Sequence, residues 1–158
     1  SRHQLPPIKA VFRGAFFTCL LLVGALAGTS PGRAAEQGIR VSEPWMRFIM
    51  LSRPAAGYFT LSNKTARNRT LVGAASPACG MLMLHRSISE NGADRMAMVN
   101  GVDVPAHGEV VFTPGGYHLM CMSPSRDMIP GHVVPVTLRF KDGNEVTTNF
   151  PVRGVAGK

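Results

Sequence analysis

Residues Met81 to Met98 read MLMLHRSISENGADRMAM, and this stretch predicts a β-hairpin. Asn91-Gly92 lies between two runs in which apolar and polar side chains tend to alternate, a pattern typical of strands. Asn-Gly is also the strongest short signal for a two-residue hairpin turn. If these two residues form the turn, Glu90 pairs with Ala93, and this pairing fixes the register of the whole hairpin.

The predicted register decides which side chains share a face. His85 lies opposite Met98, and Met96 is its diagonal neighbour at about 7–8 Å between Cα atoms. A slip of one residue would move His85 and Met96 to opposite faces. Further along the chain, His118 and Met120 are two residues apart in another predicted strand, so they also share a face.

These side chains form a soft ligand set. Two imidazoles (His85 and His118) and two thioethers (Met96 and Met120) suit Cu(I) better than they suit other biological metals. Thioethers are poor ligands for Mg²⁺ or Ca²⁺, and zinc sites use cysteine, histidine and carboxylates. We therefore predict that these four residues bind one Cu(I) ion, with Met98 as a possible auxiliary ligand.

The chain after residue 35 predicts an all-β fold, a single Greek-key β-sandwich. Apolar residues alternate or form short runs, and glycine or proline interrupts them about every ten residues. The predicted strands are Arg40–Glu43, Gly57–Asn63, Thr70–Ser76, Met81–Ile88, Arg95–Asn100, Gly108–Thr113, Tyr117–Met122, Val133–Phe140 and Glu145–Val152. The predicted core contains Phe59, Leu61, Leu71, Val110, Phe112, Val136, Leu138 and Phe140.

The first 35 residues predict an export signal. Basic residues near the start (Arg2, Lys9 and Arg13) precede an apolar run over residues 14–27, and small residues follow. The run is shorter than the roughly 20 apolar residues of a membrane-spanning helix. We expect residues 1–35 to be removed, residues 36–158 to form one domain in the periplasm, and the mature chain not to insert stably into a membrane.

The net charge gives no support for nucleic-acid binding. The chain has 17 basic and 9 acidic residues, a formal charge of +8. Four of the basic residues lie in the predicted signal, which leaves 13 against 9, or +4, for the mature chain. The remaining cations are scattered and are not interleaved with aromatic residues, as they would be on a nucleic-acid-binding surface.

Two cysteines, Cys79 and Cys121, remain after the predicted cleavage, because Cys19 leaves with the signal. In an oxidising compartment, an even pair favours a disulfide. Two buried thiols, or two further copper ligands, are the alternatives. A disulfide requires a Cα separation below about 7 Å, and the sequence does not determine that distance.

The spacing His85, ten residues, Met96, twenty-one residues, His118, one residue, Met120 resembles the signature of the periplasmic copper chaperones called PCuAC. The flanking stretches that resemble the same family are Val41–Trp45, Ala56–Phe59, Pro114–Met120 and Val133–Phe140. The resemblance implies a cupredoxin-like β-sandwich with copper near its surface. It also implies delivery of copper for the assembly of cytochrome c oxidase, to an oxidase subunit or to another copper chaperone.

One position departs from the resemblance. Some PCuAC members carry methionine directly after the first histidine, whereas this chain has Arg86 there. We expect a cation at that position to repel incoming copper slightly. For the remaining methionines of the strands and loops, packing into gaps of the core is the expected role; they are Met81, Met83, Met98, Met122 and Met128.

Two other functions are weighed against a copper chaperone. A blue-copper electron carrier needs a cysteine ligand beside its histidines, but Cys121 is predicted to point to the opposite face from His118 and Met120. A metal-free immunoglobulin-like binding module would make the histidine and methionine spacing fortuitous. The sequence contains no nucleophile elbow, phosphate-binding loop or metalloprotease motif, so we do not expect an enzyme. We expect a monomer.

Overall fold

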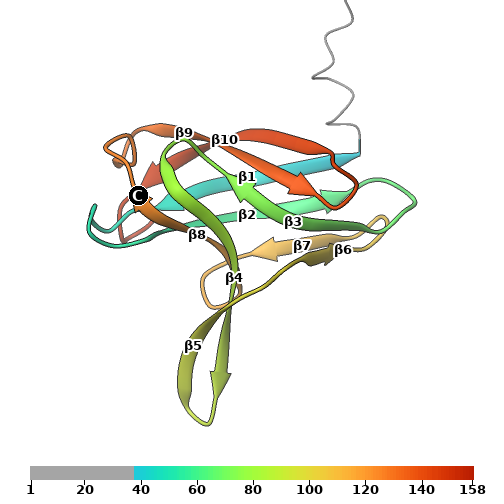
Figure 1. The fold of residues 1–158 in the computed structure, drawn as a ribbon, viewed down its shortest axis with the longest axis horizontal. Coiled ribbons are helices and arrows are strands. Elements are labelled where there is room, and N and C mark those ends of the chain that lie inside the picture. The colour runs from blue at the N-terminus through green and yellow to red at the C-terminus, as the bar shows by residue number, and fades with distance from the viewer. Residues whose placement is uncertain (1–37) are drawn as a thin grey trace, which may run out of the picture.

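The computed structural model describes residues 38–158, which form an all-β domain (Figure 1). The predicted signal segment, residues 1–35, lies outside the described residues. Residues 38–158 contain ten strands and no helix. The strands are β1 (Ile39–Arg47), β2 (Ala55–Asn63), β3 (Arg69–Ala75), β4 (Cys79–Glu90), β5 (Ala93–Met98), β6 (Val102–Val104), β7 (Glu109–Phe112), β8 (Tyr117–Pro124), β9 (Val133–Phe140) and β10 (Glu145–Arg153). The all-β prediction is confirmed.

The strands join into one continuous sheet that folds over on itself. Its order is β5-β4-β8-β7-β2-β1-β10-β9-β3-β6, and β8 also pairs with β2. One half of the sheet runs from β5 to β1 in this order, and the other half runs from β10 to β6. The two halves meet through a short parallel pairing of β1 with β10, at Met46 with Val152 and Arg47 with Arg153. Figure 1 shows β9 and β10 above β1 and β2, the layered arrangement of a sandwich.

The core lies between the two layers because apolar side chains alternate along the strands. In β9, every second residue from Val134 to Phe140 is fully buried, and the intervening residues are largely exposed. Phe59 of β2 stacks on Phe112 of β7, with ring centres 4.3 Å apart. Phe59 also meets Phe150 of β10 edge to face at 5.6 Å, so aromatic contacts link the two layers.

Two strand predictions were incomplete. The first strand was expected to end at Glu43, before Pro44, but β1 continues to Arg47. Glu43 has a φ of 51°, and the pairing with β2 shifts register between Ser42 and Trp45. This bulge lets the strand resume after a proline that has no N–H to donate. Strand β6 was missed because it is only 3 residues long.

The predicted hairpin register is confirmed. Glu90 pairs with Ala93 and His85 pairs with Met98. Asn91 and Gly92 have φ values of 53° and 75°, and a type I′ turn requires this conformation at both of its central residues. Figure 1 shows the β4–β5 hairpin projecting from the body of the domain, with β4 also lying beside β8.

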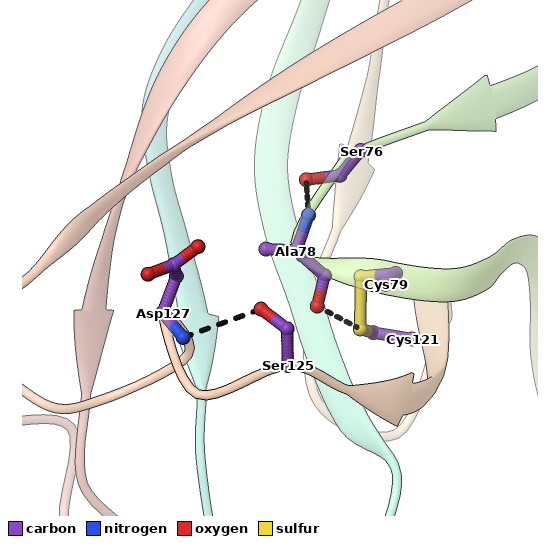
Figure 2. Close-up of a disulfide and its surroundings, with 6 residues drawn as sticks. All are labelled: Ser76, Ala78, Cys79, Cys121, Ser125 and Asp127. Carbon is purple, nitrogen blue, oxygen red and sulfur yellow. Dashed lines mark hydrogen bonds between the residues drawn. A yellow bond between two sulfur atoms is a disulfide. The ribbon is translucent and has the colours of Figure 1, made fainter.

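A disulfide joins Cys79 at the start of β4 to Cys121 in β8 (Figure 2). The two Cα atoms are 5.4 Å apart, and the side chain of Cys121 is completely buried in the core. Two tight turns flank the bond. In one, Ser76 Oγ accepts a hydrogen bond from the N–H of Ala78 at 3.2 Å. The disulfide thus connects the two strands that carry the predicted histidine ligands.

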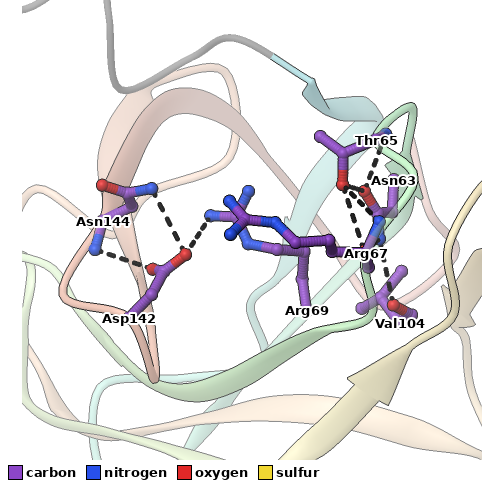
Figure 3. Close-up of polar contacts among 7 residues, drawn as sticks. All are labelled: Asn63, Thr65, Arg67, Arg69, Val104, Asp142 and Asn144. Atoms are coloured by element: carbon purple, nitrogen blue, oxygen red, sulfur yellow. Dashed lines mark hydrogen bonds and ion pairs between the residues drawn. The ribbon is translucent and has the colours of Figure 1, made fainter.

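A cluster of polar side chains links the loop after β2 to β6 and to the turn after β9 (Figure 3). Asn63, at the end of β2, is completely buried. Its amide nitrogen donates to the carbonyls of Arg67 and Val104, and its amide oxygen accepts from the backbone N–H of Thr65. Nearby, the guanidinium of buried Arg69 lies 2.9 Å from a carboxylate oxygen of Asp142. These contacts satisfy the side-chain amide of Asn63 where the chain turns between strands, whereas Nε of Arg69 has no hydrogen-bond partner.

Candidate metal centre

The two predicted histidine ligands lie side by side on neighbouring strands. His85 of β4 is the direct partner of His118 of β8 in their antiparallel pairing. Their ring centres are 5.8 Å apart and the ring planes are inclined at 63°. This separation leaves room for one ion between two ring nitrogens, since metal–nitrogen bonds are about 2.0–2.1 Å long.

The ring nitrogens of this pair are buried and largely unpartnered. Both nitrogens of His85, and Nε2 of His118, have no hydrogen-bond partner although water does not reach them. Leaving buried polar atoms unsatisfied is unfavourable. A soft metal ion between the rings would satisfy Nε2 of His118 and one nitrogen of His85, so these residues fit the predicted ion.

The second nitrogen of His118 has a structural partner. His118 Nδ1 lies 3.1 Å from the carbonyl oxygen of Gly116. A carbonyl only accepts, so Nδ1 carries the proton and Nε2 presents its lone pair. Metal-binding histidines are commonly oriented in this way by a hydrogen bond from the other ring nitrogen. The sequence analysis missed Gly116, although it adjoins His118 in the turn Pro114-Gly115-Gly116.

The two predicted methionine ligands lie beside His118. Met96 of β5 and Met120 of β8 line one cavity of about 210 Å³ together with His118. Ala56 of β2 is paired with Met120, and its small side chain also lines the cavity. Three of the four predicted ligands, Met96, His118 and Met120, thus line one cavity, and the fourth, His85, does not line it but is the strand partner of His118.

Met98 lies opposite His85, as the register predicted, but it does not line that cavity. Its side chain is 64% exposed. It lines a separate groove with Met81 and Met83. Met98 is thus not grouped with Met96 and Met120.

Several methionines predicted to fill the core are on the surface. Met81 is 58%, Met98 is 64% and Met122 is 37% exposed. Only Met128 of this group is fully buried, and Met83 is half-buried. The prediction was wrong for the exposed three because sequence alternation groups residues by face without showing which face is open to water.

The environment favours a neutral His85. Burial lowers the pKa of His85 below its usual value of 6.5, and the neighbouring His118 lowers it further. Both effects penalise the charged imidazolium. A neutral imidazole is the form that binds a metal ion, so the site is prepared for an ion near neutral pH.

The cations near the site differ from the one predicted. Arg86 was expected to repel copper, but it follows His85 in a strand and points to the opposite face. Its guanidinium carbon lies 5.2 Å from the centre of the Tyr117 ring. Instead, Arg47 and Arg53 line the cavity with Met96 and His118.

Neither a second type of metal cluster nor a membrane-spanning helix is found among the described residues. Within residues 38–158, no three histidine, cysteine, aspartate or glutamate side chains are grouped so that they could hold a metal ion. Over the same residues, no helix is long and apolar enough to cross a membrane. The cavity beside His118 is lined instead by the methionines Met96 and Met120.

Comparison with known proteins agrees with this architecture. The family model described as "Putative lipoprotein LpqE-like" matches residues 39–152. "Putative lipoprotein Lxx21020" of Leifsonia xyli subsp. xyli is 33% identical over 140 residues, which cover 88% of this chain and 82% of that protein.

Solved structures share the fold. The solution structure of CuI-DR1885 from Deinococcus radiodurans has a TM-score of 0.56 and is 30% identical, over 76% of this chain and 83% of that one. The copper-bound PCuAC domain from PmoF2 has a TM-score of 0.62 at 24% identity, over 74% of this chain and 93% of that one. The fold is thus the cupredoxin-like fold of PCuAC domains, and the chain belongs to the LpqE-like family.

Proposed function

We propose that this protein is an exported Cu(I) metallochaperone. In this proposal, His85, Met96, His118 and Met120 hold one Cu(I) ion as cargo. The observation that carries the proposal is a pair of neighbouring histidines, each with a buried ring nitrogen that has no hydrogen-bond partner, beside two thioether side chains. The solved relative named CuI-DR1885, which is 30% identical, supports Cu(I) as the ion.

Release of the ion would follow from unequal exposure of the ligands. His118 is 3% exposed, whereas Met96 on the projecting hairpin is 59% exposed. A ligand of the acceptor protein can therefore reach the ion beside Met96 first, and it can replace the Met96 sulfur before the histidines dissociate from the ion. Thioethers suit such stepwise exchange because each is a neutral, weak ligand that competes with no proton. No bond in a substrate is made or broken, so the proposed role is not enzymatic.

A docking surface adjoins the proposed site. The loop between β1 and β2 exposes Ile49 (41%), Met50 (48%) and Leu51 (48%), and Ile49 also lines the cavity of Met96 and His118. Exposed apolar side chains grouped beside a site are typical of protein-binding surfaces. We propose that a copper-accepting protein binds here, and the PCuAC resemblance favours a cytochrome c oxidase subunit or a second copper chaperone.

The proposed location is the periplasm. The first 35 residues have the composition of an export signal, and the relative from Leifsonia xyli carries the name of a lipoprotein. The disulfide between Cys79 and Cys121 agrees with an oxidising compartment. It also occupies the sulfur of Cys121 that a blue-copper centre would need, so electron transfer is not proposed.

X-ray absorption of the protein loaded with one Cu(I) equivalent tests the proposal. We expect two nitrogen and two sulfur neighbours for the native protein. Replacing His118 by alanine should lower Cu(I) affinity by about tenfold or more, measured by competition with a chromophoric Cu(I) chelator. His132→Ala is the matched control, because His132 is an exposed histidine that does not line the cavity. Unchanged affinity in His118→Ala would refute the proposed site.

A further inference from the structure

Four methionines outside the proposed Cu(I) site lie on β4 and on the two strands that pair with it, β5 and β8. Met81, Met98 and Met122 are 58%, 64% and 37% exposed, and Met83 is half-buried. Large apolar side chains gain stability from burial, so their exposure on one face has no explanation in core packing. Methionine sulfur is also a soft ligand for metal ions.

The strand register places these sulfurs next to the proposed site. Along β4 and β8, successive partners on one face are Met81 with Met122, Met83 with Met120, and His85 with His118. Neighbouring pairs on the same face of a sheet are about 6.6–6.8 Å apart along the strand. A row of soft ligands thus extends along β4 from His85, beyond the four residues assigned to the first ion.

Three of the sulfurs share a groove of their own. Met81, Met83 and Met98 line a groove of about 310 Å³ between β4 and β3. Strand β5 pairs with β4 only from His85 onward, so the edge of β4 before His85 is not covered by β5. Met83 lies between Met81 and Met98 on this face, and each of the three side chains is long and flexible.

We propose that Met81, Met83 and Met98 form a second site for Cu(I), in which all the ligands are thioether sulfurs. The identity of this ion rests on the proposed function, because a chaperone for Cu(I) is what brings the ion to this surface. Met98 lies opposite His85 and Met83 precedes it by two residues. The second site is therefore adjacent to the first along β4.

A cation lies beside the groove of the second site and disfavours a positive ion there. Arg139 of β9 also lines the groove. Its guanidinium packs against the backbone of β3, because a Cβ atom placed on Gly73 would lie 2.8 Å from one of its nitrogens. The thioethers carry no negative charge to offset this cation. The second site offers three thioethers and no imidazole, so the second ion binds more weakly than the first, and Arg139→Gln strengthens its binding.

Titration of the full chain with Ag(I), a soft monovalent ion that is stable in air, tests the proposal. Bound ions are counted by native mass spectrometry, and the methionine methyl groups are followed by NMR. The native protein binds two ions, and the methyl signals of Met81, Met83 and Met98 shift with the second. Met81→Leu/Met83→Leu binds one ion. Leucine nearly conserves the volume, so the fold is retained.

Two further variants separate the possible outcomes. Met122→Leu is the matched control: Met122 is exposed on the same face but does not line the groove, so this variant still binds two ions. His85→Ala/His118→Ala loses the first ion and keeps the sulfur-only ion. A second ion that persists in Met81→Leu/Met83→Leu, or that is lost in Met122→Leu, overturns the second site. A native protein that binds one ion also overturns it, whereas full binding by His85→Ala/His118→Ala overturns the first site alone.

Discussion

His85 and His118 are direct partners across β4 and β8, with ring centres 5.8 Å apart. They are separated by more than thirty residues in the chain, yet the strand pairing places one beside the other. Because His118 Nδ1 is held by the carbonyl of Gly116, only its Nε2 is free to meet an ion. The pair is thus arranged before any ion arrives, which reduces the entropy lost on binding.

The thioether of Met120 tests the sulfur half of the proposed site. Met120→Leu should change the free energy of unfolding by less than about 1.5 kcal/mol, because the volume is nearly conserved. It should weaken Cu(I) binding about tenfold or more, as measured by chelator competition. A variant that binds Cu(I) as tightly as the native protein would remove Met120 from the ligand set.

The lowered pKa of His85 predicts how Cu(I) binding depends on pH. Protons compete with the ion only when the imidazole is charged, so the loss of affinity through His85 should begin at a lower pH than it would for an imidazole with a pKa of 6.5. Competition titrations between pH 7.5 and pH 5 measure this. A decline that is already complete at pH 6.5 would contradict the burial of His85.

The same shift affects the stability of the metal-free protein. The pKa of His85 is lower in the folded state than its value of 6.5 in the unfolded chain. The unfolded state therefore takes up the proton first as the pH falls. The contribution of His85 to stability is fully present above pH 6.5 and is lost as the pH falls through the folded-state pKa. Urea unfolding at pH 7.5 and pH 5 should show a smaller loss for His85→Gln than for the native protein.

The disulfide should affect stability much more than Cu(I) binding. It closes a loop with a sequence separation of 42 residues, which corresponds to roughly 4 kcal/mol of stabilisation in the chain-entropy description. Cys79→Ser/Cys121→Ser, which leaves no free thiol, should therefore lower the urea midpoint strongly, while the Cu(I) affinity of the folded fraction changes little. Mass measurement of the native protein with and without reductant should show a gain of two hydrogens, and its absence would contradict the bond.

Exposure of the methionine sulfurs predicts their order of oxidation. Mild peroxide should convert Met81, Met96 and Met98 to sulfoxides before the fully buried Met46 and Met128. Peptide mass analysis gives the order, and Cu(I) affinity should fall as Met96 is oxidised. Prior loading with Ag(I) should protect the ligand sulfurs. Equal oxidation of Met46 and Met96 would contradict the burial pattern.

The local parts of this fold were predictable from the sequence. The hairpin register followed from Asn91-Gly92, because a two-residue turn fixes the pairing of the strands it joins. The continuation of β1 past Pro44 was not predictable in this way. It depends on a bulge at Glu43 and on pairing with β2.

The candidate site was predictable in its residue types but not in its assembly. The sequence placed His85 with Met96, and His118 with Met120, on shared faces. The direct pairing of His85 with His118 depends on a contact between distant strands, which no local pattern specifies. The exposure of Met81 and Met122 also depends on what covers each face of the sheet.

Formation of the Cys79–Cys121 bond changes which sulfur ligands the chain can offer to copper. Until it forms, two thiols beside β4 and β8 offer Cu(I) stronger ligands than any thioether does, and a cargo captured there would be hard to surrender. Once the bond has closed, neither sulfur is a thiol and Cys121 lies in the core, so the thioethers of the proposed site are the sulfur ligands that remain. Oxidation would thus convert a chain that retains copper into one that can give it away.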